Sequence, residues 1–293
     1  MFDYSNMLRI LFAWIVLAST LVPAGELPFD PQRGIVEVEV TIDGRVTGTF
    51  GVDTGADRLY IDRRFAEANG LRVKNGPPQR DIVGIDGSSS AWRLDLRSLE
   101  MGSDRLYNLT ATAIDMRDLI ADQRFGVPDG LIGHDVLRRF YVTVDYRAQT
   151  MNLQQAIPDF LDPRSDRTVS FSTVRHLVLV DVAIDDRKAV PMAVDLCASH
   201  TLITPWLADE LGLSDSDGSR VTIESLALGD DIAAESVAAI VKDLEVIKES
   251  SRAPIEGILG ATFLRSFKLT VDYKRQLIHF HQQVEHPAVD SSR

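Results

Sequence analysis

Two aspartates, Asp53 and Asp195, occupy equivalent positions in a sequence pattern that occurs twice in the chain. Each follows an apolar run typical of a strand and begins a segment typical of a turn, Thr54-Gly55-Ala56 after the first and Leu196-Cys197-Ala198 after the second. A carboxylate at the start of such a turn can point outward while its neighbours stay buried. Two carboxylates held close together share one proton, so that one can act as general base and the other as general acid.

The residues beside Asp53 are suited to fixing its position. The hydroxyl of Thr54 can hydrogen-bond across to a partner loop, and Gly55 lets another backbone approach closely. A single loop supplies only one carboxylate, so a pair requires a second loop of the same kind. Asp195 is the candidate, although its loop differs at the two positions that follow the aspartate.

Short strands are predicted on both sides of Asp53. Residues 46–51 place β-branched and aromatic side chains at alternate positions, and residues 59–61 are Leu-Tyr-Ile. A short helix is expected next, with Asp62 as its N-cap and Gly70 just past its end. Further strands are predicted over residues 35–42, 94–101, 106–114, 141–146, 151–153 and 176–184.

The chain contains an internal repeat. Residues 53–71 align without gaps on residues 195–213, a shift of 142, with six of 19 positions identical. Residues 130–149 align on residues 257–276, a shift of 127, with ten of 20 identical, where unrelated sequences would share about one or two. The second copy is therefore 15 residues shorter in its middle, where the first copy holds a glycine-tipped hairpin predicted over residues 82–88.

An Asp-Thr-Gly-Ala loop between two strands, in a chain made of two such copies, resembles the bilobal single-chain aspartic proteases. The resemblance covers about residues 34–281, and each copy is near the size of a retropepsin subunit. It implies the all-β acid-protease fold with short helices, in which two retropepsin-like β-barrel lobes are related by pseudo-two-fold symmetry. The implied domains are an N-terminal lobe with a flap (34–153), a linker (154–168), a C-terminal lobe without a flap (169–281) and a tail (282–293).

The resemblance also implies roles for the residues near the two aspartates. Asp53 and Asp195 would be catalytic. Leu131-Ile132-Gly133 and Ile258-Leu259-Gly260 match the apolar strands that support the aspartate loops in that family. Loop support would come from Thr54, Gly55, Leu196 and Cys197, and the flap over the substrate would be formed by Ile82, Val83, Gly84, Ile85, Asp86 and Gly87.

The activity implied by the resemblance is hydrolysis of peptide bonds by an aspartic endopeptidase. The ionised aspartate would take a proton from a bound water molecule, and its protonated partner would polarise the scissile carbonyl. The flap would close over an extended substrate and exclude bulk water. The expected partner is a peptide or protein substrate, with no cofactor and no metal, and a monomer suffices because one chain supplies both aspartates.

The second loop departs from the family pattern, which has Thr or Ser at position 196 and Gly at position 197. Leu196 cannot make the hydroxyl hydrogen bond between lobes, and Cys197 places a side chain where backbones are expected to approach closely. Three hypotheses follow: an active peptidase with a looser aspartate pair, a non-catalytic homologue that binds peptides or a protein partner in the cleft, and a homodimer that pairs two Asp53 loops. The homodimer requires an assembly step that the second lobe makes unnecessary.

Other reactive side chains are given structural interpretations. Cys197 as a nucleophile would need a general base, for which His200 is the only local candidate, so an inert buried thiol is the simpler interpretation. His279, His281 and His286 lack a spaced set of carboxylates or thiols, so no metal site is predicted.

Composition limits the class of protein and its partners. The 293-residue chain is 45% hydrophobic and carries a net charge of −12, from 31 basic and 43 acidic residues. Such a charge would repel phosphate, so no nucleic-acid partner is expected. The single cysteine, Cys197, allows no intrachain disulfide, so the fold must rest on packing.

The N-terminal segment has the features of a targeting sequence. Residues 10–22 form an apolar run that follows Arg9 and precedes Pro23-Ala24-Gly25. The run is short for a membrane span and suits the core of a secretory signal peptide over residues 1–24. Export to the periplasm or the medium is therefore expected, with retention by an uncleaved N-terminal anchor as the alternative.

Overall fold

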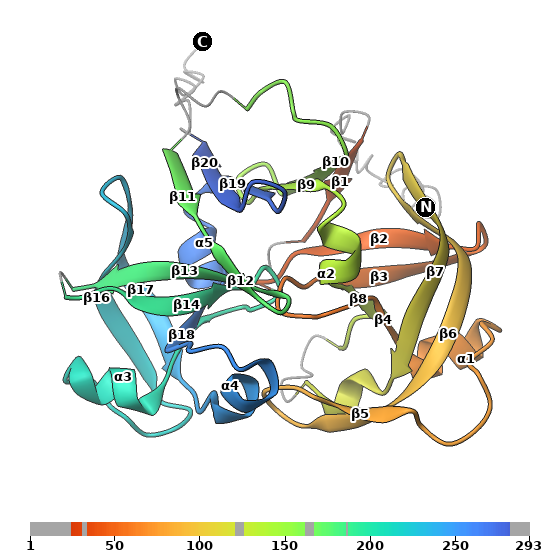
Figure 1. The fold of residues 1–293 in the computed structure, drawn as a ribbon, viewed down its shortest axis with the longest axis horizontal. Coiled ribbons are helices and arrows are strands. Elements are labelled where there is room, and N and C mark those ends of the chain that lie inside the picture. The colour runs from red at the N-terminus through yellow and green to blue at the C-terminus, as the bar shows by residue number, and fades with distance from the viewer. Residues whose placement is uncertain (1–24, 31–33, 121–125, 162–166, 186, 282–293) are drawn as a thin grey trace, which may run out of the picture.

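The computed structural model of the chain describes residues 25–30, 34–120, 126–161, 167–185 and 187–281. The predicted signal peptide and the predicted tail lie outside these residues, as does part of the predicted linker. Within them the chain is mostly β-strand and forms two lobes joined by a sheet (Figure 1). In this described part of the chain, no helix is long and apolar enough to cross a membrane.

The N-terminal lobe is a closed six-stranded barrel. Its strands follow the order β2, β3, β8, β4, β7 and β6, and a further pairing between β2 and β6 closes the ring. A seventh strand, β5, pairs with β6 and extends beyond the barrel. The strands are β2 (Glu37–Ile42), β3 (Val46–Val52), β4 (Tyr60–Asp62), β5 (Arg80–Val83), β6 (Ser88–Met101), β7 (Asp104–Ile114) and β8 (Gly130–Ile132).

The C-terminal lobe repeats this barrel strand for strand. Its order is β13, β14, β18, β15, β17 and β16, closed by a pairing between β13 and β16, while β12 is added at the edge on β13. The strands are β12 (Ser172–Val174), β13 (Leu177–Ile184), β14 (Val190–Val194), β15 (Thr201–Ile203), β16 (Arg220–Leu228), β17 (Ile232–Val241) and β18 (Gly257–Leu259). The predicted all-β fold of two related barrel lobes is therefore confirmed. The strand predicted from His176 begins one residue later, since His176 lies in the turn between β12 and β13.

A six-stranded sheet joins the two lobes. Its order is β1 (Glu26–Pro28), β10 (Thr150–Gln154), β9 (Tyr141–Asp145), β19 (Lys268–Asp272), β20 (Leu277–His281) and β11 (Arg167–Ser170). The central strands β9 and β19 are antiparallel and their register pairs Thr143 with Thr270, whose hydroxyl oxygens are 2.8 Å apart. The 127-residue shift of the repeat relates these same two threonines. The pseudo-two-fold axis therefore passes between them.

The helices of the described residues are short and sit at strand ends. Asp62 is the N-cap of the first, as predicted: its carboxylate accepts from the N–H of Phe65 (2.9 Å), and Gly70 follows the helix with a positive φ of 64°. Thr204 caps the equivalent helix of the second lobe. The helices are α1 (Arg63–Ala68), the 3₁₀ helix η2 (Met116–Asp118), α2 (His134–Leu137), α3 (Pro205–Glu210), α4 (Glu245–Ser251) and α5 (Ala261–Leu264).

One apolar cluster runs through both barrels and the sheet between them. In β2, Val38, Val40 and Ile42 are buried and the intervening Glu39 is exposed, which is the alternation expected of a barrel strand. Leu196 belongs to the same cluster and is 0% exposed. Full burial of a leucine side chain contributes roughly 1.5–3 kcal/mol to folding, so this departure from the family pattern stabilises the core.

Candidate active site

The Asp53 loop is held by the strand that passes beneath it. β3 lies parallel to β8, and the N–H of Asp53 donates to the carbonyl oxygen of Ile132 (3.0 Å). The N–H of Gly55 donates to the Asp53 carboxylate (2.8 Å). A Cβ atom on Gly133 would lie 2.3 Å from the carbonyl oxygen of Arg58, so only glycine fits where the two segments cross.

The Asp195 loop has the same construction. The N–H of Asp195 donates to the carbonyl oxygen of Leu259 (3.0 Å), and the N–H of Cys197 donates to the Asp195 carboxylate (2.8 Å). A Cβ atom on Gly260 would lie 2.3 Å from the carbonyl oxygen of His200. The backbone geometry of this loop is therefore preserved in spite of the residues at positions 196 and 197.

The two carboxylates meet across Gly55. A Cβ atom added to Gly55 would lie 3.1 Å from Asp195 Oδ2 and 3.2 Å from Asp53 Oδ1, so the two oxygens are no farther apart than the sum of these distances. Any side chain at this position would enter the space that both carboxylates border. The structure thus brings together the two aspartates that the repeat pairs in the sequence.

Both carboxylates hold their protons more tightly than exposed aspartates do. Burial raises the pKa of Asp53 well above its ordinary value of 3.8, and the neighbouring charge of Asp195 raises it further. Burial raises the pKa of Asp195 to about 6, against the opposing hydrogen bond from Cys197. As pH rises, the pair therefore passes through a state with one proton for two carboxylates, which is the state that can act as acid and base together.

Thr54 connects the two loops. Its hydroxyl donates to the carbonyl oxygen of Val194 (2.7 Å) and accepts from the N–H of Leu196 (3.2 Å). The carbonyl oxygen of Leu196 also accepts from the N–H of Val36 in the first lobe (3.1 Å). Thr54 therefore contacts the second lobe through its side chain, whereas Leu196 contributes only backbone groups and core packing.

Cys197 fits because the first lobe makes room for it. A Cβ atom on Gly51 would lie 2.8 Å from Cys197 Sγ, so the thiol occupies the space that a side chain at position 51 would need. In the alignment of the two copies, with its shift of 142, Ala193 is equivalent to Gly51 and Cys197 is equivalent to Gly55. Cys197, which is larger than its equivalent Gly55, therefore packs against Gly51, which is smaller than its equivalent Ala193. The expected conflict between Cys197 and a close backbone does not arise.

The predicted flap is a hairpin that lies beside the Asp53 loop. β5 and β6 pair from Arg80 with Ala91 to Val83 with Ser88, and the N–H of Gly84 donates to the carbonyl oxygen of Gly87 at the tip (2.9 Å). Ile82 packs against an apolar patch of the first lobe, which we call the N-wall. The buried residues of the N-wall are Ala56, Tyr60, Ala91, Ile114 and Met116.

The tip of the flap reaches the opposite lobe. Ile85 packs against a second apolar patch, the C-wall, and the carboxylate of Asp86 lies 3.1 Å from the ammonium group of Lys242. The buried residues of the C-wall are Leu177, Leu179, Ala193, Leu244, Ala253, Ile255 and Ile258. Ala198, three residues after Asp195, is packed against the same patch. The flap therefore bridges the two lobes above the aspartate loops.

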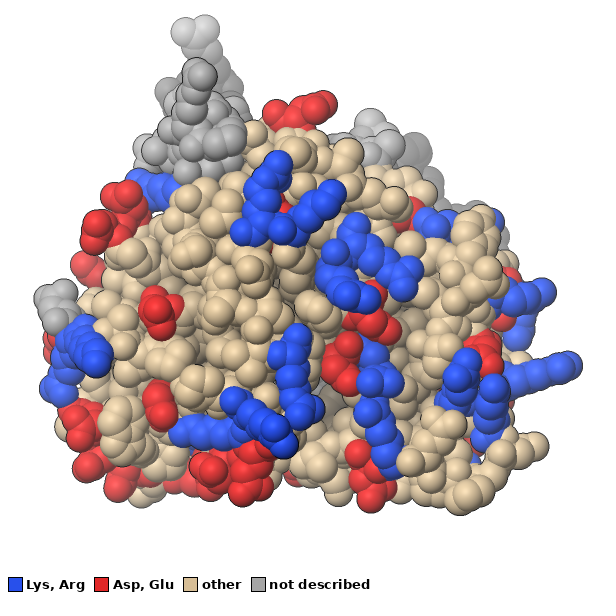
Figure 2. All heavy atoms as spheres, in the orientation of Figure 1, with Lys and Arg blue, Asp and Glu red and all other residues tan. Residues whose placement is uncertain are grey.

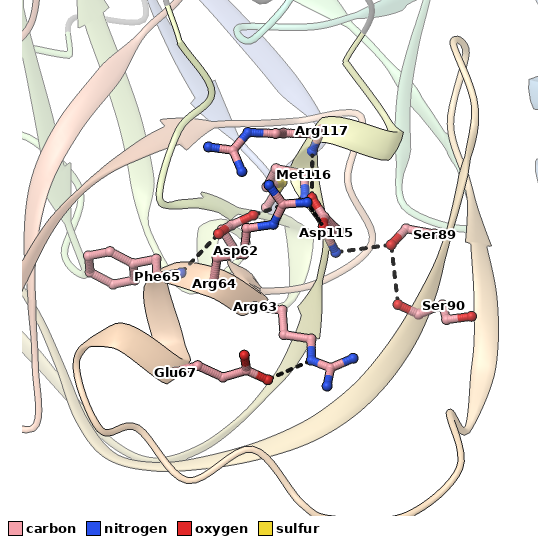
Figure 3. A network of polar contacts seen from close by, with 10 residues as sticks. All are labelled: Asp62, Arg63, Arg64, Phe65, Glu67, Ser89, Ser90, Asp115, Met116 and Arg117. Carbon is pink, nitrogen blue, oxygen red and sulfur yellow. Dashed lines mark hydrogen bonds and ion pairs between the residues drawn. The ribbon is translucent and has the colours of Figure 1, made fainter.

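A polar network holds the β6 strand of the flap hairpin against the first lobe close to the tip (Figure 3). The N–H of Asp115 donates to the hydroxyl of Ser89 in β6 (3.0 Å), and the Asp115 carboxylate pairs with Arg64 of α1 (2.8 Å). Asp62 accepts from the N–H of Met116 (3.1 Å). A polar hollow of about 500 Å³ borders this network. Asp115 lines it, but Asp53 and Asp195 do not.

Basic side chains gather along the middle of one face, where the lobes meet (Figure 2). Near the Asp53 loop, Arg58 and Arg80 both pair with Asp57, at 2.8 Å and 3.7 Å. Although the chain has a negative net charge, acidic side chains are therefore not spread evenly over this face.

Lys242→Met is expected to loosen the flap. A partly exposed ion pair contributes about 0.2–1 kcal/mol, so hydrogen exchange at the tip amides should rise by a factor of about 1.4 to 5. Lys248→Met is the matched control, because Lys248 pairs with Glu256 at the same 3.1 Å and is equally buried, with 24% of its side chain exposed against 27% for Lys242. Equal exchange at Gly84 in the two variants would contradict an ionic contribution to flap closure.

Three contributors to the site have no local sequence signal. Gly51, Lys242 and His176, whose Nε2 lies 2.8 Å from the carbonyl oxygen of Gly55, all act on residues of the other lobe. Of these three, Gly51 alone could have been found by comparing the two copies. Gly51 is smaller than its equivalent Ala193, while Gly55 is smaller than its equivalent Cys197.

The other reactive residues do not form a second site in the part of the chain that is described. His200 Nδ1 lies 3.0 Å from the hydroxyl of Ser199. His279 Nε2 lies 4.0 Å from the buried carboxylate of Asp272. No group of three His, Cys, Asp or Glu side chains among the described residues is arranged to hold a metal ion.

Comparison with known protein families finds a match in each of the two lobes. A model of the aspartyl protease family matches residues 38–136 and 180–263, which together make up more than half of the chain. Each matched segment lies mainly in one lobe and contains one of the two aspartates. A search of curated proteins returned no similar protein.

Proposed function

Because the chain belongs to the aspartyl protease family, we propose that it is an aspartic endopeptidase whose catalytic pair is Asp53 and Asp195. The observation that carries this proposal is the meeting of two carboxylates with raised pKa values across Gly55. General acid–base hydrolysis requires one carboxylic acid and one carboxylate that border the same space.

The reaction proceeds without a covalent bond to the enzyme. The ionised aspartate takes a proton from a water molecule between the two carboxylates, and the water oxygen attacks the scissile carbonyl carbon. The protonated aspartate gives its proton to the carbonyl oxygen, which produces a neutral gem-diol. The first aspartate then protonates the amide nitrogen, the C–N bond breaks, and one gem-diol hydroxyl returns a proton to the second aspartate.

The substrate is proposed to be an unstructured peptide or protein segment. It would lie extended between the N-wall and the C-wall, with the flap above it and the aspartates below. An extended chain can satisfy its backbone donors and acceptors against the flap as an added strand. Since both aspartates come from one chain, a monomer is the proposed active form.

A non-catalytic peptide-binding protein is the second candidate. Two observations favour it: Leu196 supplies no hydroxyl to the pair, and the flap tip already packs on the C-wall, where a substrate side chain would have to displace Ile85. In this function the cleft and flap would hold a peptide without cleaving it.

The test is hydrolysis of an unstructured protein by the purified chain, across roughly pH 3–9, a range that begins below the ordinary pKa of a carboxyl group and extends well above it. In water enriched in ¹⁸O, each new carboxyl terminus is expected to carry one ¹⁸O atom from the attacking water. Absence of cleavage at every pH would contradict the peptidase. If the same preparation binds a peptide whose scissile bond is replaced by a hydroxyl-bearing isostere, the binding protein is the correct function.

A further inference from the structure

His176 connects the second lobe to the Asp53 loop. It lies in the turn between β12 and β13, and its Nε2 is 2.8 Å from the carbonyl oxygen of Gly55. A carbonyl oxygen can only accept, so Nε2 carries the proton and donates. Burial lowers the pKa of His176, and a neutral imidazole protonated at Nε2 can donate this bond.

The repeat has no counterpart to this histidine. The 142-residue shift that relates Asp53 to Asp195 relates Gly34 to His176, and Gly34 has no side chain. A Cβ atom on Gly34 would lie 3.2 Å from the Cβ of Ser199, so the first lobe touches the Asp195 loop here by packing alone. The bond from His176 to Gly55 is therefore a feature of one half of the site.

This asymmetry matches a second one at position 196. The first lobe gives the Asp195 loop the hydroxyl of Thr54 and the N–H of Val36. The second lobe cannot return a hydroxyl to the Asp53 loop, because Leu196 stands in that place. His176 returns a hydrogen bond to the same loop, two residues after Asp53.

We propose that His176 is a positioning residue that replaces the missing hydroxyl of position 196 and holds the Asp53 loop against the second lobe. It acts through Gly55, whose carbonyl oxygen accepts from His176 and whose N–H donates to the Asp53 carboxylate (2.8 Å). Fixing Gly55 therefore fixes the direction of one catalytic carboxylate. This inference rests on the proposed function for its catalytic consequence and on geometry alone for its effect on the loop.

The effect on the loop is measured by hydrogen exchange, which needs no activity. His176→Ala is expected to raise exchange at the Gly55 amide about fivefold, the factor that corresponds to one net hydrogen bond. The Cys197 amide is the internal control, because it makes the equivalent 2.8 Å bond to the Asp195 carboxylate in the other loop. Equal changes at both amides, or none at either, would overturn the proposal.

The catalytic consequence is measured in the same variants. His176→Ala is expected to lower kcat about tenfold with KM within about twofold, and His176→Gln, which keeps a side-chain N–H, to recover part of the loss. Arg175→Asn is the matched control: Arg175 is exposed in the same turn, and asparagine tolerates its positive φ of 57°. An equal loss of kcat in Arg175→Asn would reject a specific role for His176.

Leu196→Thr in the His176→Ala background tests whether the two positions substitute for each other. The new hydroxyl is expected to raise kcat by a larger factor in this background than in the wild-type chain, and a smaller or equal factor would contradict the replacement. Leu196 is buried, so the exchange readout at Gly55 and the Gln variant remain decisive if the double variant is unstable. Should the wild-type chain cleave nothing while Gly55 responds selectively, the positioning role stands and the peptidase is rejected.

Discussion

Asp195→Asn is expected to keep its fold and to lose peptide hydrolysis by a factor of about 10²–10⁴. The same loss is expected for Asp53→Asn. Asparagine preserves the shape of the side chain and can still accept the loop N–H bond that each aspartate receives, from Gly55 in one case and from Cys197 in the other. It can neither take a proton from water nor give one to the carbonyl oxygen at these positions, so the one-proton state of the pair no longer exists.

The measurement is kcat/KM with a cleavable peptide, accompanied by binding of the hydroxyl-bearing peptide to establish that the cleft is intact. Asp95→Asn is the control, because Asp95 is exposed on β6 and pairs with Lys74 and Arg93. Loss of activity in Asp53→Asn alone, with Asp195→Asn still active, would contradict the intrachain pair. A doubled mass in solution would then favour the homodimer of two Asp53 loops.

The pH profile follows from the raised pKa values. Below the lower apparent pKa of the pair both carboxyls are protonated and no base is present. Because the pKa of Asp195 is raised to about 6, activity is expected to fall as pH decreases through about 6. Activity is also expected to fall at higher pH, where the shared proton is lost. These two limbs belong to the pair and not to either aspartate separately.

Much of this site could be predicted from the sequence because of the repeat. Asp53 alone is a short motif, and Asp195 sits in a loop that has lost Thr and Gly, yet the shift of 142 places the two at equivalent points. The barrel strands of the first lobe could be predicted as well, since alternation of apolar and polar residues is a local property of each strand. The flap followed from the extra residues in the first copy.

The contacts between lobes could not be predicted in the same way, because they depend on where distant surfaces meet. The fit of Cys197 against Gly51 depends on the approach of β3 to the second loop, and the Asp86–Lys242 pair depends on how far the flap tip reaches. Leu196 illustrates the same limit. Its type indicates a lost hydroxyl, but only packing shows that the side chain is part of the common core.

Asp195→Asn is also expected to stabilise the protein at alkaline pH. The pKa of Asp195 is about 6 in the folded chain, raised by burial, against an ordinary value of 3.8 when unfolded. Between these values the folded chain binds more protons than the unfolded chain, so the free energy of unfolding decreases as pH rises from about 4 through about 6. Each unit of pKa shift corresponds to about 1.4 kcal/mol, which sets a cost on the order of 1–3 kcal/mol above pH 6.

Asparagine removes this cost, since it never ionises. The free energy of unfolding of Asp195→Asn, from urea titration, is therefore expected to exceed that of the wild-type chain by roughly 1–3 kcal/mol at pH 8 and to equal it at pH 4. Asp95→Asn should show the opposite sign, because Lys74 and Arg93 lower the pKa of Asp95 and make its charge favourable. A destabilised Asp195→Asn at pH 8 would contradict the burial cost. If the gain is found together with the loss of hydrolysis, the pair is held at the expense of stability, as expected of a site selected for chemistry rather than for folding.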